Sequence, residues 1–136
     1  MAIDRAQRLF LLFMGISLTP IALSYGLVPQ QSLPLLYGIS DPDLPTRHIF
    51  RAVMGLYLGM ICFWLAGVLR PDLRIAALWG VFVFVTGIAL GRVLSLVLDG
   101  WPGPLLFFYL LAECVLAATS LALILRGRGG NDGVPA

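Results

Sequence analysis

Residues 46–60 read TRHIFRAVMGLYLGM, and they place the only histidine of the chain and two arginines at the mouth of an apolar run. The run continues to Leu69, which is long enough for a helix to cross the ~30 Å of hydrocarbon in a bilayer. A charge inside such a helix costs at least ~2.5–3.5 kcal/mol at the membrane centre. The segment therefore predicts a transmembrane helix within a bundle, where neighbouring spans supply partners for its polar side chains.

Composition extends this prediction to the whole chain. The 136 residues are 60% hydrophobic and 12% charged, whereas soluble domains average about 25% charged residues. Four apolar runs account for the difference, at about 9–28, 47–69, 74–98 and 104–125. We predict an all-α fold, a four-helix transmembrane bundle with up-down-up-down topology. It forms one domain over residues 1–128, and a flexible tail follows at 129–136.

The connection between the first two runs, residues 29–46, has a different character. It reads PQQSLPLLYGISDPDLPT, and its prolines and Asp-Pro step argue against one regular helix throughout. Its leucines and tyrosine are too apolar for a solvated linker. We expect it to fold over one end of the bundle as an extracytoplasmic cap, with Thr46 as the candidate N-cap of the second span.

The placement of arginines predicts the orientation in the membrane. The chain contains no lysine, so every side-chain cation other than histidine is an arginine. Only Arg47 lies outside the spans on the capped side, whereas the side of the termini carries Arg5, Arg8, Arg70, Arg74, Arg126 and Arg128. Positive residues favour the cytoplasmic side. We therefore expect a multi-pass protein of the cytoplasmic membrane, surrounded by lipid bilayer, with both termini in the cytoplasm.

Several functions lack the residues that they need. No basic stripe is present, so we expect no nucleic-acid partner. Cys62 and Cys114 lie inside apolar runs, without the spacing of a disulfide framework or a metal site. His48 has no second histidine with which to hold a haem. The sequence also lacks a phosphate-binding glycine loop and a nucleophile motif. We expect no metal, no cofactor and no enzymatic activity.

Five polar residues form the candidate site. At 1.5 Å per residue, Arg51 lies ~7 Å inside the second run and Arg92 lies ~10 Å before the end of the third. Glu113 lies ~13 Å into the fourth. Because consecutive spans alternate in direction, all three depths are measured from the same surface. We predict an ion pair between Arg92 and Glu113, with Arg51 and His48 nearby. The full cluster is His48, Arg51, Arg92, Asp99 and Glu113.

This cluster has three interpretations. The first is a structural lock that fixes the register of the helices. The second is a binding pocket under the cap. Two arginines against one glutamate would leave a positive surplus there, which suits an anionic or carbonyl-bearing lipophilic ligand. The third is catalysis or proton transfer through His48 and Glu113, although one histidine and one glutamate are few for a catalytic site.

Small and aromatic residues on the spans indicate packing. Gly55 with Gly59, and Gly87 with Gly91, have the spacing that lets helices approach closely. We expect these glycines to mediate helix packing inside the bundle rather than dimerisation. Tyr57 and the phenylalanines of the spans are interpreted as lipid-facing or core residues.

Two stretches carry a resemblance to a known family. They are HIFRAVMGLYLGMICFW at 48–64 and GRVLSLVLDGWPGPLLFFYLLAE at 91–113. They resemble an uncharacterised family of small four-helix bacterial membrane proteins, known only as a domain of unknown function. More loosely, the layout is similar to DoxX-like small bundles, of which some members act as accessory membrane subunits. The resemblance implies the fold and the polar set but no activity.

The expected function follows from the small soluble surface. Nearly everything available for recognition faces lipid, so we expect a non-enzymatic accessory or interaction subunit of a larger membrane complex, or a self-associating protein. The alternative is a binder of a lipophilic small molecule, either anionic or carbonyl-bearing, in the polar cluster of the outer leaflet.

Overall fold

The protein is all-helical in a computed structural model that describes residues 2–129. These residues contain no strand and form α1 (Ala2–Gly26), α2 (Pro29–Tyr37), α3 (Leu44–Leu69), the 3₁₀ turn η1 (Pro71–Leu73), α4 (Arg74–Asp99) and α5 (Pro104–Gly129). Four of the helices, α1, α3, α4 and α5, are long and apolar enough to cross a membrane. The predicted four-helix bundle is confirmed. The tail expected at 129–136 lies outside the described residues except for Gly129, which belongs to α5.

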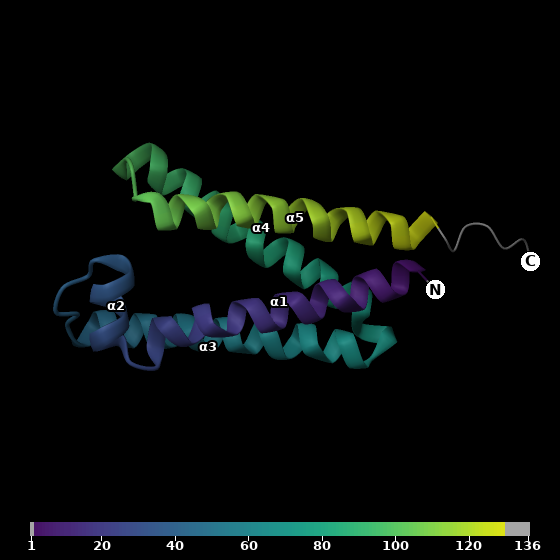
Figure 1. Cartoon of the computed structure of the whole chain (residues 1–136), viewed down its shortest axis with the longest axis horizontal. Helices are drawn as coiled ribbons and strands as arrows, with labels where there is room; N and C mark the ends of the chain where they lie inside the picture. Colours follow the sequence, from purple (N-terminus) through teal and green to yellow (C-terminus); the bar gives the residue numbers. More distant parts are fainter. Residues whose placement is uncertain (1, 130–136) are drawn as a thin grey trace, which may run out of the picture.

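The spans form two antiparallel pairs. α1 lies along α3, and α4 lies along α5 (Figure 1). The start of α1 and the end of α5 lie at one end of the bundle, which we call the terminal end. The short helix α2 packs against α1 and α3 at the opposite end, which we call the α2 end. There the α4–α5 turn stands apart from α2, so α2 covers one pair of helices rather than the whole bundle.

The core lies where α1, α3 and α4 meet. Its largest fully buried side chains include Leu11 and Met14 from α1, Trp64 from α3 and Leu78 from α4. Ser120 of α5 is also fully buried, and its hydroxyl donates to the carbonyl of Leu78 at 2.8 Å. Since lipid tails are as apolar as these side chains, close packing and such interhelical hydrogen bonds hold the spans together.

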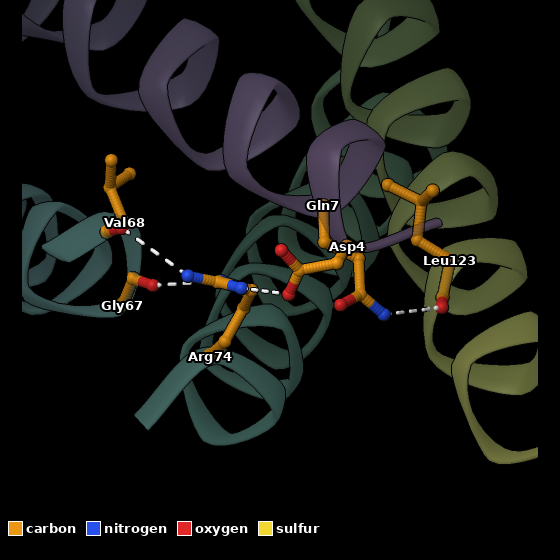
Figure 2. A network of polar contacts seen from close by, with 6 residues as sticks. All are labelled: Asp4, Gln7, Gly67, Val68, Arg74 and Leu123. Atoms are coloured by element: carbon orange, nitrogen blue, oxygen red, sulfur yellow. Dashed lines mark hydrogen bonds and ion pairs between the residues drawn. The ribbon is translucent and has the colours of Figure 1, made fainter. Parts of the chain in front are cut away.

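A polar clamp closes the terminal end (Figure 2). Arg74, whose side chain is buried, donates to the carbonyls of Gly67 and Val68 at 3.2 and 3.4 Å and forms an ion pair with Asp4. The two carbonyls belong to the last turn of α3, where a helix leaves acceptors unpaired. Gln7 donates to the carbonyl of Leu123 at 3.0 Å. The clamp therefore ties the first turns of α1 to the α3–α4 corner and to α5.

The first half of the cap segment forms the helix α2, Pro29–Tyr37, and, as its prolines predict, no single helix runs throughout residues 29–46. Pro29 occupies the first turn of α2, where a missing N–H costs nothing. The helix ends at Gly38, whose positive φ of 68° suits glycine, with backbone bonds from Gly38 to Pro34 and from Ile39 to Leu33. Leu33 is fully buried, so its apolar side chain anchors α2 to the bundle.

The start of α3 differs from the prediction. Its N-cap is Asp43 rather than Thr46, because the Asp43 carboxylate accepts a hydrogen bond from the backbone amide of Thr46 at 2.9 Å. Hydrogen bonds from the side chain and the backbone amide of Thr46 hold the pKa of Asp43 below its usual 3.8. The helix therefore begins at Leu44, three residues before the predicted span at 47.

The expected glycine packing is wrong. A Cβ built at any of the four predicted packing glycines meets no atom within 4 Å, and all four are exposed: Gly55, Gly59, Gly87 and Gly91. Close helix approach occurs at other glycines. A Cβ at Gly67 would lie 2.5 Å from the Cβ of Ala77, and one at Gly15 would lie 2.8 Å from Leu65. On α3 the paired glycines Gly55 and Gly59 lie on the outer face, and Gly67 is the one glycine on the inner face, so glycine spacing indicated the wrong face.

Candidate functional site

An ion pair within the bundle is the centre of the site. The Nε atom of Arg92 on α4 lies 3.0 Å from both Oε1 and Oε2 of Glu113 on α5. The Arg92 and Glu113 side chains are 20% and 12% exposed, so neither charged group is fully buried. Two charges at membrane depth are tolerated when they pair with each other. The predicted contact between these two residues is present in the structure.

The ion pair lines a cavity among the four spans. The cavity has a volume of about 60 Å³, well below the range of about 300–1,000 Å³ typical of small-molecule sites, so it has room for a small group rather than for a whole ligand. Its wall is mostly aliphatic, with polar groups gathered toward the α2 end. The lining residues are Leu18, Ile21, Tyr25, Tyr57, Val85, Ile88, Arg92, Tyr109, Ala112, Glu113 and Leu116.

All four tyrosines of the chain gather around this polar end. The rings of Tyr25 and Tyr37 stack with centroids 5.5 Å apart, and Tyr57 lies 5.4 Å from Tyr25. The guanidinium of Arg92 lies over the ring of Tyr109, with its central carbon 5.6 Å from the ring centroid. The hydroxyl of Tyr37 is also 3.3 Å from that of Ser24. Four different helices thus supply one cluster of phenol groups beside the ion pair.

The guanidinium of Arg92 keeps donors for a further partner. Both of its hydrogen bonds to Glu113 come from Nε, and within residues 2–129 no hydrogen bond involves its two Nη groups. Arg92 also lines a second hollow near the α4–α5 turn, of about 70 Å³, together with Ser95, Pro102 and Phe107. The arginine therefore stands between the cavity and the end of the bundle where that turn lies.

The remaining members of the predicted cluster lie elsewhere. Arg51 is exposed, and its Nε donates to the carbonyl of Gly26, the last residue of α1, at 3.4 Å. His48 is exposed and does not line the cavity. Asp99 is exposed and accepts a hydrogen bond from Ser95 at 2.7 Å. The lining of the cavity contains one cation and one anion, so the positive surplus expected from two arginines is absent.

The tyrosine cluster is the part of the site that sequence reasoning missed. The sequence pattern predicts Tyr57 as a lipid-facing or core residue and Tyr37 as an apolar residue of the cap, but it does not bring the four tyrosines together. A signal was available. Tyr25 lies near the end of α1 and Tyr109 near the start of α5, so both belong at the same level as Arg92 and Glu113.

Metal-binding groups do not assemble within the described part of the chain. In residues 2–129, no three His, Cys, Asp or Glu side chains lie close enough together to hold an ion. Cys62 and Cys114 are free and exposed on the surfaces of α3 and α5. The chemistry of the cavity is therefore that of hydroxyl groups, one guanidinium and one carboxylate.

Fold and site together define a class of protein. This is a multi-pass helical membrane protein with a small, mostly apolar cavity beside an ion pair between its spans. The chain belongs to the family described as a domain of unknown function, DUF4345, whose family model matches residues 6–124. The match extends from α1 into the last turns of α5 and includes both Arg92 and Glu113. Neither the curated proteins nor the solved structures gave a match to the chain.

Proposed function

We propose that the protein binds a lipophilic small molecule whose polar group enters the cavity among its spans. One observation supports this above the others: the Arg92–Glu113 pair and three tyrosines line a void whose remaining wall is aliphatic. A few convergent polar groups in an otherwise apolar hollow are typical of small-molecule sites. The cavity would hold and orient the oxygen-bearing group of the molecule, and the hydrocarbon body would extend out of the cavity.

A purely structural lock would not need this arrangement. A lock requires the two charges to pair and the helices to close around them. Here the pair is partly accessible, with side chains 20% and 12% exposed, and Arg92 keeps unused donors toward the hollows on either side. These features favour binding over a role in helix register alone.

The proposed role is non-enzymatic. Glu113 is the only carboxylate in the cavity lining and is engaged with Arg92, while His48 lies outside the cavity. General acid–base catalysis needs a proton-transfer group within reach of the reacting atom. Only the phenol groups and the paired carboxylate fill that position, so retention of an unchanged ligand is the expected behaviour.

Chemical analysis of the purified protein tests the proposal. The protein is extracted from its own membrane in mild detergent, and small molecules that remain bound are released in organic solvent and quantified by mass spectrometry. We expect one class of molecule in a near-constant ratio to protein. It should be lost in the double variant Arg92→Gln/Glu113→Gln, which keeps the net charge, and retained in Arg51→Gln. Equal retention in the double variant, or bulk lipid alone in the wild type, would overturn the proposal.

A role as an accessory subunit is the second candidate. The four exposed glycines on α3 and α4 favour it, because a partner helix could approach these surfaces closely. Gly55→Leu and Gly59→Leu should then release a stoichiometric protein partner during mild purification without unfolding the chain. Gly38 is not a suitable control because its φ is positive; Ala118→Leu, at an exposed site on α5, is the matched change.

The proposed location is the cytoplasmic membrane with both termini in the cytoplasm. Arg5, Arg8, Arg70 and Arg126 lie at the terminal end, where a cytoplasmic surface would retain positive charge. A single cysteine introduced at Ser40, in a chain with Cys62 and Cys114 replaced by Ala, should react with an impermeant maleimide added to whole cells. A cysteine at Asp72 should react only after the cells are opened. The reverse pattern would contradict the orientation.

A further inference from the structure

A long apolar groove lies between α1 and α5. Its outer rims are the exposed side chains Phe13 on α1 and Phe108, Leu111 and Val115 on α5. On α1 it runs from Phe13 to Ile21, about 12 Å at 1.5 Å per residue. Its lining has two hydroxyl residues, Ser17 and Tyr109. The Ser17 hydroxyl donates to the carbonyl of Phe13 within α1 at 2.7 Å, so it is already satisfied.

The groove adjoins the cavity beside the ion pair. Five residues line both hollows: Leu18, Ile21, Tyr109, Ala112 and Leu116. They form a seam in which two side chains of α1 face three of α5. The clamp at the terminal end holds α1 to α5 through Gln7 and Leu123, far from this level. Ala112 is the smallest residue of the seam, so the separation between cavity and groove is thinnest beside it.

The two hollows differ in chemistry in a way that one molecule can satisfy. The groove, of about 500 Å³, offers hydrocarbon contacts, whereas the much smaller cavity is lined by the charged pair Arg92 and Glu113. An ordinary lipid chain resting in the groove would leave the cavity unused. A molecule with a compact polar head and one long chain fills both, with the head beside Arg92 and the chain in the groove.

The charge of the cavity selects the kind of head group. Arg92 is already paired with Glu113, so the two charges of the lining cancel. An anionic head would bring a second negative charge toward Glu113, and a cationic head would approach Arg92. A neutral carbonyl or hydroxyl oxygen avoids both costs, because it accepts from the free Nη groups and from phenol hydroxyls.

We propose that the ligand is a neutral, single-chain amphipath that reaches the cavity sideways from the bilayer through the α1–α5 seam. Its oxygen-bearing head lies in the cavity, and its hydrocarbon chain lies in the α1–α5 groove. This inference rests on the proposed function, since it assumes that the cavity is a binding site. It adds the chemical class of the ligand and the route by which the ligand arrives.

Photolabelling with two defined probes tests the inference. The protein is placed in phosphatidylcholine nanodiscs with hexadecanol or hexadecanoic acid, each carrying a diazirine and an alkyne on the chain. Labelled peptides are identified by mass spectrometry, with and without excess untagged hexadecanol. The competed signal should fall on α1 residues 13–21 and α5 residues 108–116. The hexadecanol probe should label these segments more strongly than the acid.

Two tryptophan substitutions on α5 separate the seam from the helix surface. Ala112→Trp fills the seam and should lower the competed labelling about tenfold or more, the effect of losing roughly two buried methylene groups. Ala118→Trp places the same side chain at an exposed site outside the groove and should leave labelling unchanged. Circular dichroism of both variants confirms that the helices persist.

The outcomes distinguish this inference from the proposed function. If labelling is competed and is lost in Arg92→Gln/Glu113→Gln but is equal in Ala112→Trp and Ala118→Trp, the cavity binds and the seam is not its route. If the acid labels more strongly than the alcohol, the neutral head group is wrong. If excess hexadecanol competes with neither probe at either segment, both the inference and the proposed function fail for this class of molecule.

Discussion

The Nε atom of Arg92 is equidistant, at 3.0 Å, from the two carboxylate oxygens of Glu113. The two residues belong to neighbouring spans joined by a short turn, Gly100–Gly103. Their contact fixes the α4–α5 hairpin at the level of the tyrosine cluster, and it also forms the polar wall of the cavity. The same pair therefore has a structural role and the proposed binding role, and the two can be separated by substitution.

The two single substitutions of this pair should differ in cost. Glu113→Gln leaves a guanidinium without its counter-charge, and an arginine cannot release its proton to become neutral. Arg92→Gln leaves a carboxyl group, which can take up a proton and become neutral. We expect Glu113→Gln to lower the free energy of unfolding by about 3 kcal/mol, near the low end for breaking a buried pair, and Arg92→Gln by less.

Unfolding of the variants in mild detergent measures this difference. The double variant Arg92→Gln/Glu113→Gln should be more stable than Glu113→Gln alone, because it leaves no unpaired charge. If Arg92→Gln is the more damaging single change, the account of the pair as a charge pair at membrane depth is wrong.

The terminal clamp should depend on Arg74 far more than on Asp4. The Arg74 side chain is 5% exposed and satisfies two carbonyls of α3, so Arg74→Ala leaves both acceptors unpaired. We expect a loss of about 2–4 kcal/mol in the free energy of unfolding. The Asp4 side chain is 57% exposed, and Arg74 keeps both carbonyl acceptors in Asp4→Asn, so this change should cost less than Arg74→Ala. Similar losses from the two variants would contradict the clamp geometry.

Two glycines of α3 should respond in opposite directions to alanine. At Gly67 the new Cβ would lie 2.5 Å from the Cβ of Ala77, so Gly67→Ala should cost about 1–3 kcal/mol by overpacking. At Gly55 there is open space, and Gly55→Ala should be neutral or should stabilise the isolated protein by up to about 1 kcal/mol through helix propensity. Thermal unfolding in detergent compares them. A costly Gly55→Ala would indicate that this face is packed.

The Asp43 cap gives a pH-dependent signal outside the spans. Its folded pKa is lowered below 3.8 by hydrogen bonds from Thr46, so the carboxylate stabilises the start of α3 above the unfolded pKa. That stabilisation is lost as the pH falls through the folded pKa. In an NMR titration, the Thr46 amide resonance should move with a midpoint below 3.8. A midpoint at or above that value, or no movement, would show that Asp43 does not cap the helix.

Depth in the membrane was predictable from the sequence, whereas direction around the helix was not. Arg92 and Glu113 occur at similar depths on consecutive spans, and the cost of an unpaired charge makes their contact the expected solution. Arg51 shares that side of the membrane, but its side chain reaches the last carbonyl of α1 instead. The position of a residue along its span gives its depth in the membrane. It does not show which neighbouring helix its side chain contacts at that depth.

The glycines of α3 show why the inward-facing side of a span could not be predicted from the sequence. A soluble helix reveals its inner face through a polar outer face, but a lipid-facing helix is apolar all round. On α3 the inner face carries Tyr57, Ile61, Trp64 and Val68, all buried, and the outer face carries Gly55 and Gly59. Both faces contain residues suited to packing. Which face of α3 turns inward depends on how side chains fit together at Gly67 and Trp64. The periodicity of the sequence carries no information about that fit.

The central claim is that the cavity beside Arg92 and Glu113 holds the polar group of a lipophilic molecule. A crystal structure grown in a lipidic mesophase, from protein purified out of its own membrane, tests it most directly. The account predicts elongated density between α1 and α5, with an oxygen-bearing end within hydrogen-bond distance of Arg92 Nη or a tyrosine hydroxyl. A cavity closed by side chains, or one occupied by ordered water alone, would contradict it.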